Sequence, residues 1–442
     1  MAAYLSRLHH ISLHVSNADR IACDLVSRFK FNLFAARVSG KSKQLALRKG
    51  AAVFVVNERP NQVTLRCHED LQSATGRRED LQKRCRGGPV KHLYDVNPQY
   101  SVDTACNVCF EVEDVGRSFK ALCDQGCDFL VPPTVVQDER GLVTYSIVKS
   151  IVGNVSHTLV DRTKYEGSFL PGFDDVGNVN NNWKADNRAC PVTHFDHITY
   201  ACPSKTTPRV MHWYEKAFGF QRFFIDSNED VDEGYVLNQD GIGLRLTAME
   251  YWKCSKAGIT LPFKNENEPD CKFVIAESLP EQGSNQVDTF LEEHRGPGIQ
   301  HIGLYTQDIV STAHTMAEAG VQFFSPPPTY YTEVGKQQEI EEAGHNPQML
   351  AQYGILLDTD LCQDAQSHTA SLENKRYLLQ VFTKPIFAED TFFLELIERR
   401  GASGFGEGNI RALWRSVQAY MENERGHPTG ESTLKNVQTA QR

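Results

Sequence analysis

The sequence predicts an α+β fold made of two similar halves, each built from two strand–helix–strand–strand–strand (βαβββ) modules that form curved mixed sheets. Three pairs of segments carry this prediction, because they recur in the same order in residues 5–170 and 190–410. Self-similarity of this kind predicts repeated structural units rather than one continuous domain. Strands and helices that do not alternate strictly are typical of the α+β class.

The first pair of segments predicts the strand and helix that open each half. Residues 8–15 (LHHISLHV) resemble residues 195–202 (FDHITYAC), and both are short runs rich in apolar and β-branched side chains. A helical stretch follows each run and ends in a phenylalanine-rich turn, at 28–35 and at 217–224. We therefore expect a strand followed by a helix at the start of each half.

The other two pairs predict the second module of each half. Residues 106–133 resemble residues 300–327, and in both an apolar strand leads through an aspartate into a helix that a glycine closes, before a strand runs into proline. Aspartate before a helix and glycine after it are the usual start and stop signals. Finally, residues 156–162 (SHTLVDR) resemble residues 393–399 (FLELIER), which predicts one more equivalent strand.

These repeats divide the chain into four parts. We predict an N-terminal domain without metal at 1–170, an Asn-rich linker at 171–190, a C-terminal catalytic domain at 191–422 and a disordered tail at 423–442. Charged segments at 67–100 and 264–270 have no counterpart in the repeat and are interpreted as insertions.

The composition excludes several classes of partner. The chain has 442 residues, 40% of them hydrophobic, and a net charge of −10, which argues against nucleic acid as a partner. No apolar run approaches the roughly 20 residues that span a bilayer. Twelve cysteines at irregular spacings indicate reduced thiols rather than a disulfide framework. Arg7 and Arg20 fit a mitochondrial targeting segment, but residues 7–15 also read as the first strand.

The repeat also provides an internal control for a metal site. Aligning the halves gives three corresponding pairs: His197 with His10, His301 with Asn107, and Glu395 with Thr158. The C-terminal half thus offers two imidazoles and a carboxylate, whereas the N-terminal half offers a poor set of metal ligands. Two histidines and one carboxylate on one face of Fe(II) form the triad of O₂-activating enzymes. Three open positions remain, two for a 2-oxo acid and one for O₂.

Each of these residues also has a simpler interpretation. A single histidine at the start of a strand is usually a structural hydrogen-bonding group. Glu395 is less easily explained, because a lone carboxylate in the apolar strand FFLELIE costs several kcal/mol. The pairs Cys106/Cys109 and Cys123/Cys127 resemble a zinc site superficially. Cys106 and Cys109 should point to opposite faces of a strand, and the other two should lie on one helix, so we predict no zinc there.

At these residues the chain resembles the 4-hydroxyphenylpyruvate dioxygenase family of the vicinal oxygen chelate superfamily. The resemblance covers residues 7–425 outside the insertions, and residues 44–58 resemble the vertebrate dioxygenase-like branch of that family. The motifs that carry it are FDHI (195–198), GIQHIGL (298–304), TYY (329–331), ILLDTD (355–360), YLLQVFTKP (377–385), FFLELIERR (392–400) and GFGEGN (404–409).

The resemblance implies a role for each matching position. It implies that His197, His301 and Glu395 bind one Fe(II) per chain. The pattern of residues 408–424 predicts an amphipathic helix over the active site, which would exclude water. A homodimer is compatible with the resemblance. The substrate-binding residues that it implies are Gln286, Gln300, Gln380, Phe382, Phe393, Phe405, Asn409, Ile410 and Leu413.

Three positions depart from the dioxygenase pattern and bear on the product. Leu246, Ala276 and Ile410 stand where the dioxygenases have serine, asparagine and phenylalanine. Isoleucine at the last position resembles hydroxymandelate synthase, which makes a different product from the same substrate. We therefore expect 4-hydroxyphenylpyruvate and O₂ to give 4-hydroxymandelate and CO₂, and the resemblance implies mitochondrial work supplying the 4-hydroxybenzoate ring of ubiquinone. The alternatives are homogentisate formation in tyrosine catabolism and a catalytically silent binding protein.

Overall fold

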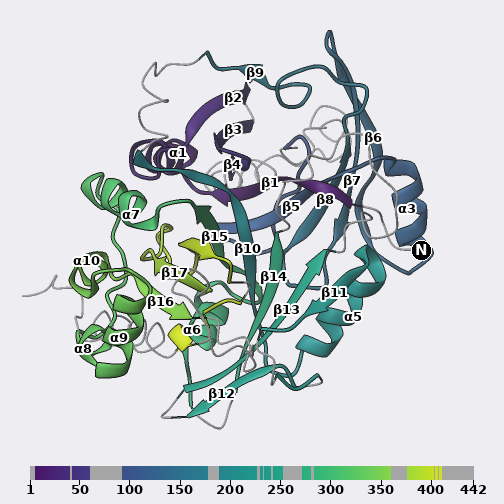
Figure 1. Ribbon diagram of the computed structural model, residues 1–442. Helices are drawn as coiled ribbons and strands as arrows, with labels where there is room; N and C mark the ends of the chain where they lie inside the picture. Colours follow the sequence, from purple (N-terminus) through teal and green to yellow (C-terminus); the bar gives the residue numbers. More distant parts are fainter. Residues whose placement is uncertain are drawn as a thin grey trace, which may run out of the picture.

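Two mixed β-sheets with few helices make up the described part of the protein (Figure 1). The computed structural model describes residues 5–39, 42–59, 92–177, 189–225, 229–231, 233–239, 242–251, 271–279, 283–359, 376–402, 404–406 and 408–410. The predicted α+β class with two similar halves is confirmed. Within this part, no helix is long and apolar enough to cross a membrane.

The N-terminal sheet contains two βαβββ modules in succession, in the strand order β6-β7-β8-β5-β1-β4-β3-β2-β9. The first module is β1 (Leu5–Val15), α1 (Ala18–Ser27), β2 (Asn32–Ser39), β3 (Ser42–Lys49) and β4 (Ala52–Glu58). The second is β5 (Thr104–Val112), α3 (Val115–Cys123), β6 (Phe129–Asp138), β7 (Gly141–Lys149) and β8 (Ser156–Asp161), and the short β9 (Asp174–Asp175) follows.

The C-terminal sheet repeats this plan with additions, in the order β11-β13-β14-β10-β15-β18-β17-β16, with β12 paired to β13. Its first module is β10 (Val192–Cys202), α5 (Thr207–Phe218), β11 (Phe220–Phe223), β12 (Tyr235–Gln239), β13 (Ile242–Tyr251) and β14 (Lys272–Ser278), and α6 (Gln286–Glu293) follows. Its second is β15 (Gly298–Thr306), α7 (Ile309–Glu318), α8 (Thr329–Thr332), α9 (Val334–Glu342), α10 (Pro347–Tyr353), β16 (Leu356–Thr359), β17 (Tyr377–Phe382) and β18 (Phe393–Arg400).

The start signals read from the repeat operate as helix caps. The Asp114 side chain accepts a hydrogen bond from the backbone N–H of Arg117 at the start of α3, and Asp308 accepts one from Ser311 at the start of α7. A carboxylate at this position satisfies one of the amide groups that the first helical turn leaves unpaired. The two second modules therefore begin in the same way.

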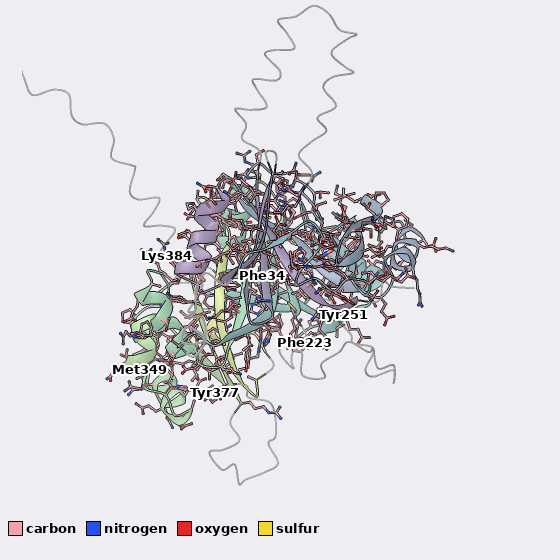
Figure 2. The ribbon with its side chains drawn as sticks, turned by 90° about the horizontal axis from the view of Figure 1, so that it is seen from above. Phe34, Phe223, Tyr251, Met349, Tyr377 and Lys384 are labelled. Carbon is pink, nitrogen blue, oxygen red and sulfur yellow. The ribbon has the colours of Figure 1, made fainter. Side chains whose placement is uncertain are left out.

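One predicted element differs between the halves. Residues 129–133 belong to β6 as expected, but the corresponding residues 323–327 form only an isolated bridge, between Phe323 and Thr383. This stretch runs into three consecutive prolines, residues 326–328, whereas β6 contains two, and proline has no N–H to donate to a sheet. Helices α8 to α10 fill this place instead, on one side of the C-terminal sheet, where Met349 and Tyr377 are labelled in Figure 2.

The two sheets pack against each other through a shared apolar core. Phe54 lies against Phe195 with ring centroids 5.0 Å apart, and Phe110 contacts the ring of Phe273. A buried hydrogen bond of 2.8 Å between His157 Nε2 and the Tyr214 hydroxyl also joins the halves. This packing fixes the strands β10 and β15, which carry two of the candidate ligands.

Candidate metal centre and substrate cavity

Three adjacent strands bring His197, His301 and Glu395 together. His197 on β10 and Glu395 on β18 both lie opposite Gly303 of the central strand β15. His301 lies two residues before Gly303 on the same strand, so its side chain points to the same face of the sheet. The pairing register therefore brings three side chains, spread over almost 200 residues of the chain, onto one face of the sheet.

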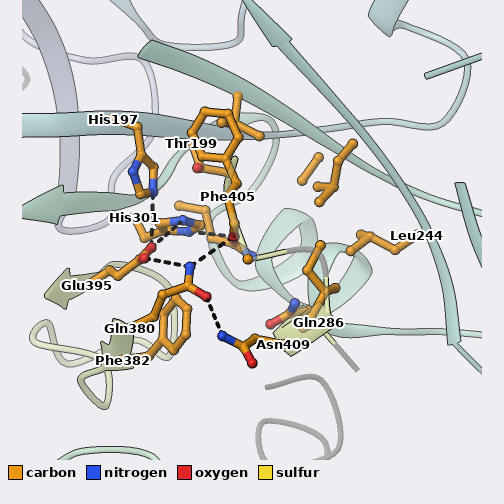
Figure 3. A pocket seen from close by; sticks show the side chains of 16 residues that line it. His197, Thr199, Leu244, Gln286, His301, Gln380, Phe382, Glu395, Phe405 and Asn409 are labelled. Carbon is orange, nitrogen blue, oxygen red and sulfur yellow. Dashed lines mark hydrogen bonds and ion pairs between the residues drawn. The ribbon is translucent and has the colours of Figure 1, made fainter. Parts of the chain in front are cut away.

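The ligand atoms of these side chains converge on one point (Figure 3). Suitable atoms of all three lie within 4.8 Å of one another. His197 Nε2 is 3.0 Å from Glu395 Oε2, and His301 Nε2 is 3.6 Å from the same oxygen. His197 and Glu395 are buried, and the His301 side chain is largely shielded.

Both imidazoles have their other nitrogen engaged. His197 Nδ1 lies 2.9 Å from Asp196 Oδ1, and His301 Nδ1 lies 3.1 Å from Gln300 Oε1. Both partners are acceptors, so both Nδ1 atoms donate, and a neutral imidazole then has only a lone pair on Nε2. Two such lone pairs and a carboxylate oxygen facing one another repel unless a cation lies between them.

A proton can serve as that cation when no metal is bound. Burial opposes a charge on His197, but the carboxylate of Glu395 and the carboxylate of Asp196 outweigh it and raise the pKa of His197 to about 9. Burial and the neighbouring His197 hold the pKa of His301 well below its usual value. The donor set of two imidazole nitrogens and one carboxylate oxygen is that of a facial Fe(II) site, so the residues fit the metal that the sequence predicts.

A hydrogen-bonded chain holds the carboxylate in place. Gln380 Nε2 on β17 donates to Glu395 Oε1 at 3.0 Å and to the Phe405 carbonyl at 2.9 Å. Gln380 Oε1 accepts from Asn409 Nδ2, whose Oδ1 accepts from the Tyr330 hydroxyl at 2.7 Å. Because Gln380 donates to Oε1 of Glu395, the other carboxylate oxygen, Oε2, faces the imidazoles.

The triad lies at one end of a cavity with about 580 Å³ of empty space, part of it open to solvent. One wall is apolar and includes Leu246, Ala276 and Ile410, while amide and hydroxyl groups lie elsewhere in the lining. No lysine or arginine is among the described residues that line it, which are His197, Thr199, Leu244, Leu246, Val274, Ala276, Gln286, Gln300, His301, Gln380, Phe382, Glu395, Phe405, Gly406, Asn409 and Ile410.

Seven of the nine substrate-binding residues predicted from the sequence line this cavity, and Phe393 does not. Phe393 stacks on the His301 ring, with centroids 4.8 Å apart and planes at 18°, so it supports a candidate ligand from behind. Leu413 and most of the predicted helix 408–424 lie outside the described residues. Gln300 lines the cavity but also binds His301, which gives it a second function.

Several residues of the site were not singled out from the sequence, among them Thr199, Gly303, Asp196 and Arg399. Gly303 faces His197 so closely that a Cβ atom there would lie 2.4 Å from Cε1 of the imidazole. Asp196 and Arg399 form a buried ion pair behind His197. The sequence could have indicated Asp196, because it directly precedes His197 in the motif FDHI. The close contact of Gly303 with His197 could not be predicted in this way, because it depends on the register of two strands.

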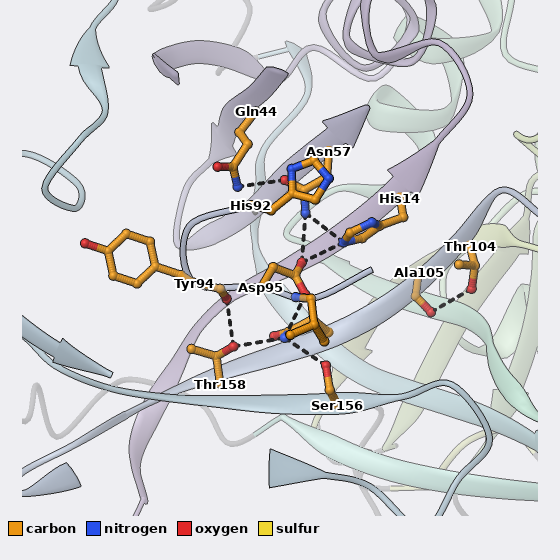
Figure 4. A network of polar contacts seen from close by, with 12 residues as sticks. His14, Gln44, Asn57, His92, Tyr94, Asp95, Thr104, Ala105, Ser156 and Thr158 are labelled. Carbon is orange, nitrogen blue, oxygen red and sulfur yellow. Dashed lines mark hydrogen bonds and ion pairs between the residues drawn. The ribbon is translucent and has the colours of Figure 1, made fainter. Parts of the chain in front are cut away.

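The N-terminal half has a polar network at the corresponding place (Figure 4). His10, Asn107 and Thr158 occupy the register positions of His197, His301 and Glu395, as the sequence alignment paired them. Asn107 Nδ2 donates to Thr158 Oγ1 at 2.9 Å and to the buried carboxylate of Asp95, which also lies 2.9 Å from His14 Nε2. Protein groups therefore occupy the space that corresponds to the candidate metal centre.

A second group of potential ligands in this half was not anticipated. Ligand atoms of His9, His10 and Cys109 lie within 4.8 Å of one another. Two observations account for them as neutral, packed groups: the Nδ1 atoms of the histidines are 2.7 Å apart, and burial lowers the pKa of His9 to about 3 and raises that of the Cys109 thiol. That the N-terminal half binds no metal stays a prediction.

Comparisons with known proteins agree with this architecture. The family model described as "Glyoxalase/Bleomycin resistance protein/Dioxygenase superfamily" matches residues 194–347. In solved structures, the chain resembles a mutant of 4-hydroxymandelate synthase from Streptomyces coelicolor, with a TM-score of 0.65 and 20% identity over 95% of this chain and 99% of that one. At this identity the likeness shows the fold.

Relatives of higher identity show the family. The 4-hydroxyphenylpyruvate dioxygenase-like protein of Rattus norvegicus is 42% identical over 96% of this chain and 100% of its own length, and that of Homo sapiens is 40% identical over 95% and 98%. The 4-hydroxyphenylpyruvate dioxygenase of Yarrowia lipolytica is 30% identical over 72% of each chain. The chain therefore belongs to the 4-hydroxyphenylpyruvate dioxygenase family, in the branch called 4-hydroxyphenylpyruvate dioxygenase-like protein.

Proposed function

We propose that the protein is an iron-dependent dioxygenase that converts 4-hydroxyphenylpyruvate and O₂ to 4-hydroxymandelate and CO₂. The observation that carries the proposal is the convergence of His197 Nε2, His301 Nε2 and Glu395 Oε2 at one end of the cavity. Fe(II) held by these atoms supplies coordination positions for a 2-oxo acid and O₂, together with the electrons that activate O₂.

The charges in the cavity explain why the substrate would be a chelating 2-oxo acid. The described lining holds no lysine or arginine to meet a carboxylate, and Glu395 is itself negative. A divalent ion on Glu395 leaves one positive charge, which one substrate carboxylate neutralises. We therefore expect 4-hydroxyphenylpyruvate to bind the iron-loaded protein and not the metal-free protein.

The remaining lining suits the aromatic end of this substrate. The rings of Phe382 and Phe405 can flank a phenol, since aromatic pairs favour edge-to-face and offset contacts. Gln286, on α6, carries an amide that can bind the phenolic hydroxyl. Phe405, Gly406, Asn409 and Ile410 form part of the cavity wall, and a wall that excludes water protects a reactive intermediate from side reactions.

The choice of product rests on the apolar wall. Leu246, Ala276 and Ile410 line the cavity and pack in one apolar cluster, where the family usually has serine, asparagine and phenylalanine. Isoleucine is smaller than phenylalanine, so the space beside the substrate side chain changes. We propose that this space lets the benzylic carbon, instead of the ring, receive the second oxygen atom, which gives 4-hydroxymandelate.

Product identification tests the proposal. Protein purified without metal is loaded with Fe(II) under anaerobic conditions, mixed with 4-hydroxyphenylpyruvate and exposed to O₂, with Glu395→Ala as the inactive control. The two candidate products are isomers, so chromatography against authentic standards must precede mass spectrometry. 4-Hydroxymandelate as main product is expected. Homogentisate as main product would contradict the product assignment and favour the alternative in tyrosine catabolism.

The alternative function, a catalytically silent binding protein, has its own test. It is favoured only by the loss of the polar groups at Leu246 and Ala276, and an iron-loaded protein that consumes no O₂ would support it.

We also propose a mitochondrial location and supply of the 4-hydroxybenzoate ring for ubiquinone. Cell fractionation checks the first, and transfer of ring-labelled 4-hydroxymandelate into ubiquinone checks the second.

A further inference from the structure

Behind the candidate metal centre, a buried ion pair fixes the histidine of β10. Asp196 Oδ1 lies 2.9 Å from His197 Nδ1, on the side of the imidazole opposite Glu395. The same carboxylate accepts two hydrogen bonds from Arg399, from Nε to Oδ2 at 2.7 Å and from Nη2 to Oδ1 at 2.8 Å. Asp196 is 7% exposed, so water does not replace these contacts.

Arg399 connects this pair to two other parts of the site. It lies on β18 four residues after Glu395, and its Nη1 donates to the carbonyls of Ala402 and Gly404. The next residue, Phe405, places its ring 5.3 Å from the His197 ring at an angle of 87°. One guanidinium group therefore links the strand of His197, the strand of Glu395 and the loop that forms part of the cavity wall.

The internal repeat shows which contacts of Arg399 also occur in the half without the triad. Arg162 follows Thr158 by four residues, as Arg399 follows Glu395, and its Nη2 donates to the carbonyl of Gly167 at 2.8 Å. The contact from arginine to loop thus exists in both halves. It occurs in the N-terminal half although asparagine and threonine replace two of the three candidate ligands there.

What differs between the halves is the residue before the first histidine. His9 stands at the place of Asp196, and its Nδ1 lies 2.7 Å from His10 Nδ1. A neutral imidazole supplies one nitrogen lone pair, whereas a carboxylate held by arginine supplies a negatively charged acceptor of fixed direction. Of these two equivalent positions, only the one beside the triad carries the acidic residue.

We infer that Asp196 is a positioning residue for the metal centre: held by Arg399, it keeps the His197 Nδ1–H donated toward itself and so directs the Nε2 lone pair at the ion. The inference rests on the proposed iron site. A histidine ligand generally gives its second N–H to a carboxylate or carbonyl, which fixes the tautomer and orients the ring. Replacing Asp196 by asparagine leaves an amide that can offer either a donor or a weaker, uncharged acceptor to Nδ1.

A purely structural ion pair would behave differently. Such a pair would matter only for joining β10 to β18, and buried pairs contribute little to stability compared with apolar packing. Removing its charge would change the unfolding midpoint and leave the affinity for metal unchanged. A positioning pair changes the affinity for metal as well. Removing one partner of a buried ion pair destabilises the fold in either case, so the affinity for metal, and not the unfolding midpoint, separates the two interpretations.

The test measures Fe(II) affinity by anaerobic competition with a chromophoric chelator, beside the absorption spectrum of the Co(II)-loaded protein. For Asp196→Asn we expect about a 10- to 100-fold loss of affinity and an altered Co(II) spectrum. Arg399→Lys should act in the same direction, because lysine cannot hold the carboxylate with two parallel bonds. The matched control, Arg162→Lys, removes the corresponding arginine of the other half and should leave affinity and spectrum as in the wild type.

The outcomes separate the inference from the proposed function. If the wild type binds one iron and Asp196→Asn binds it equally tightly, the inference is overturned while the metal centre stands. If the wild type binds no iron, the proposed function itself fails and the inference with it. Should Asp196→Asn not fold, the comparison of Arg399→Lys with Arg162→Lys decides, and equal affinities for those two variants overturn the inference.

Discussion

Gln380 donates an N–H to Oε1 of Glu395 over 3.0 Å, which leaves the other carboxylate oxygen to the two imidazoles. The amide has no free hydrogen-bonding atom to spare, because its Oε1 accepts from Asn409 and its Nε2 also serves the Phe405 carbonyl. Gln380 therefore supports the candidate ligand and the cavity wall together, although the sequence pointed to substrate binding alone.

Replacing Gln380 by leucine should weaken iron binding. The variant keeps a side chain of similar size and removes the N–H group that donates to Glu395 Oε1. We expect about a 10-fold loss of Fe(II) affinity, within the range of other partners of metal ligands. The control is Gln286→Leu, which alters the same cavity on α6. It should raise KM for the substrate and keep the iron, so equal iron affinities in the two variants would refute this assignment.

Gly303→Ala should displace His197. A Cβ atom at this position would lie 2.4 Å from Cε1 and 2.5 Å from Nδ1 of the imidazole, so the ring must move away from residue 303. We expect the affinity for iron to fall at least as far as in Gln380→Leu, with about 1–3 kcal/mol lost from the free energy of unfolding. Gly335→Ala is the matched control, since nothing lies within 4 Å of a Cβ atom there. Normal iron binding by Gly303→Ala would contradict the geometry.

Ile410→Phe should shift the product toward homogentisate. The larger ring fills the space beside the substrate side chain, so attack on the aromatic ring becomes easier than attack on the benzylic carbon. A tenfold change in the product ratio requires only about 1.4 kcal/mol between the two barriers. The ratio is measured by chromatography against standards at equal turnover. An unchanged ratio would disconnect residue 410 from the choice of product.

The protein should lose stability as the pH falls below about 6.5, and His157 should account for part of the loss. Burial lowers the pKa of His157 to about 3, whereas the unfolded chain keeps the ordinary value near 6.5. The unfolded state therefore binds the proton between these two values, and stability is full above pH 6.5. Each such histidine costs up to about 1.4 kcal/mol per pH unit within this window.

The measurement is the unfolding free energy from urea titrations between pH 7.5 and pH 4.5, values that bracket the unfolded-state pKa of about 6.5. His157→Gln keeps a polar side chain near the Tyr214 hydroxyl but cannot be protonated, so its stability should depend less steeply on pH. Since other buried histidines titrate as well, some dependence remains. A slope identical to that of the wild type would show that His157 does not contribute.

Much of the fold could be predicted from the sequence because short local patterns reveal the repeat. Asp114 and Asp308 cap the corresponding helices, and the strands that lead into them, β5 and β15, carry matching apolar patterns. The failure at residues 323–327 came from treating the repeat as complete, although three consecutive prolines cannot continue a sheet. The predicted strand was therefore wrong where the residues of the second half differ from those of the first.

The site was predictable to the extent that it depends on residue type at equivalent strand positions. His301 and Asn107 occupy equivalent places, and the difference between imidazole and amide is visible in the letters alone. The partners of the ligands were not visible in this way. Arg399 reaches Asp196 over 203 positions in the sequence, and only the packing of β10 near β18 brings them together. Phe393, expected at the substrate, lies behind His301 for the same reason.

The central claim is that His197, His301 and Glu395 together hold one ferrous ion. Its most direct test is the iron content of anaerobically loaded and desalted protein, measured for the wild type, His301→Ala and His10→Ala. The account predicts one iron per wild-type chain, none retained by His301→Ala, and one retained by His10→Ala, because His10 occupies the equivalent place in the half that lacks the other two ligands. Iron retained by His301→Ala, or lost from His10→Ala while that variant remains folded, would contradict it.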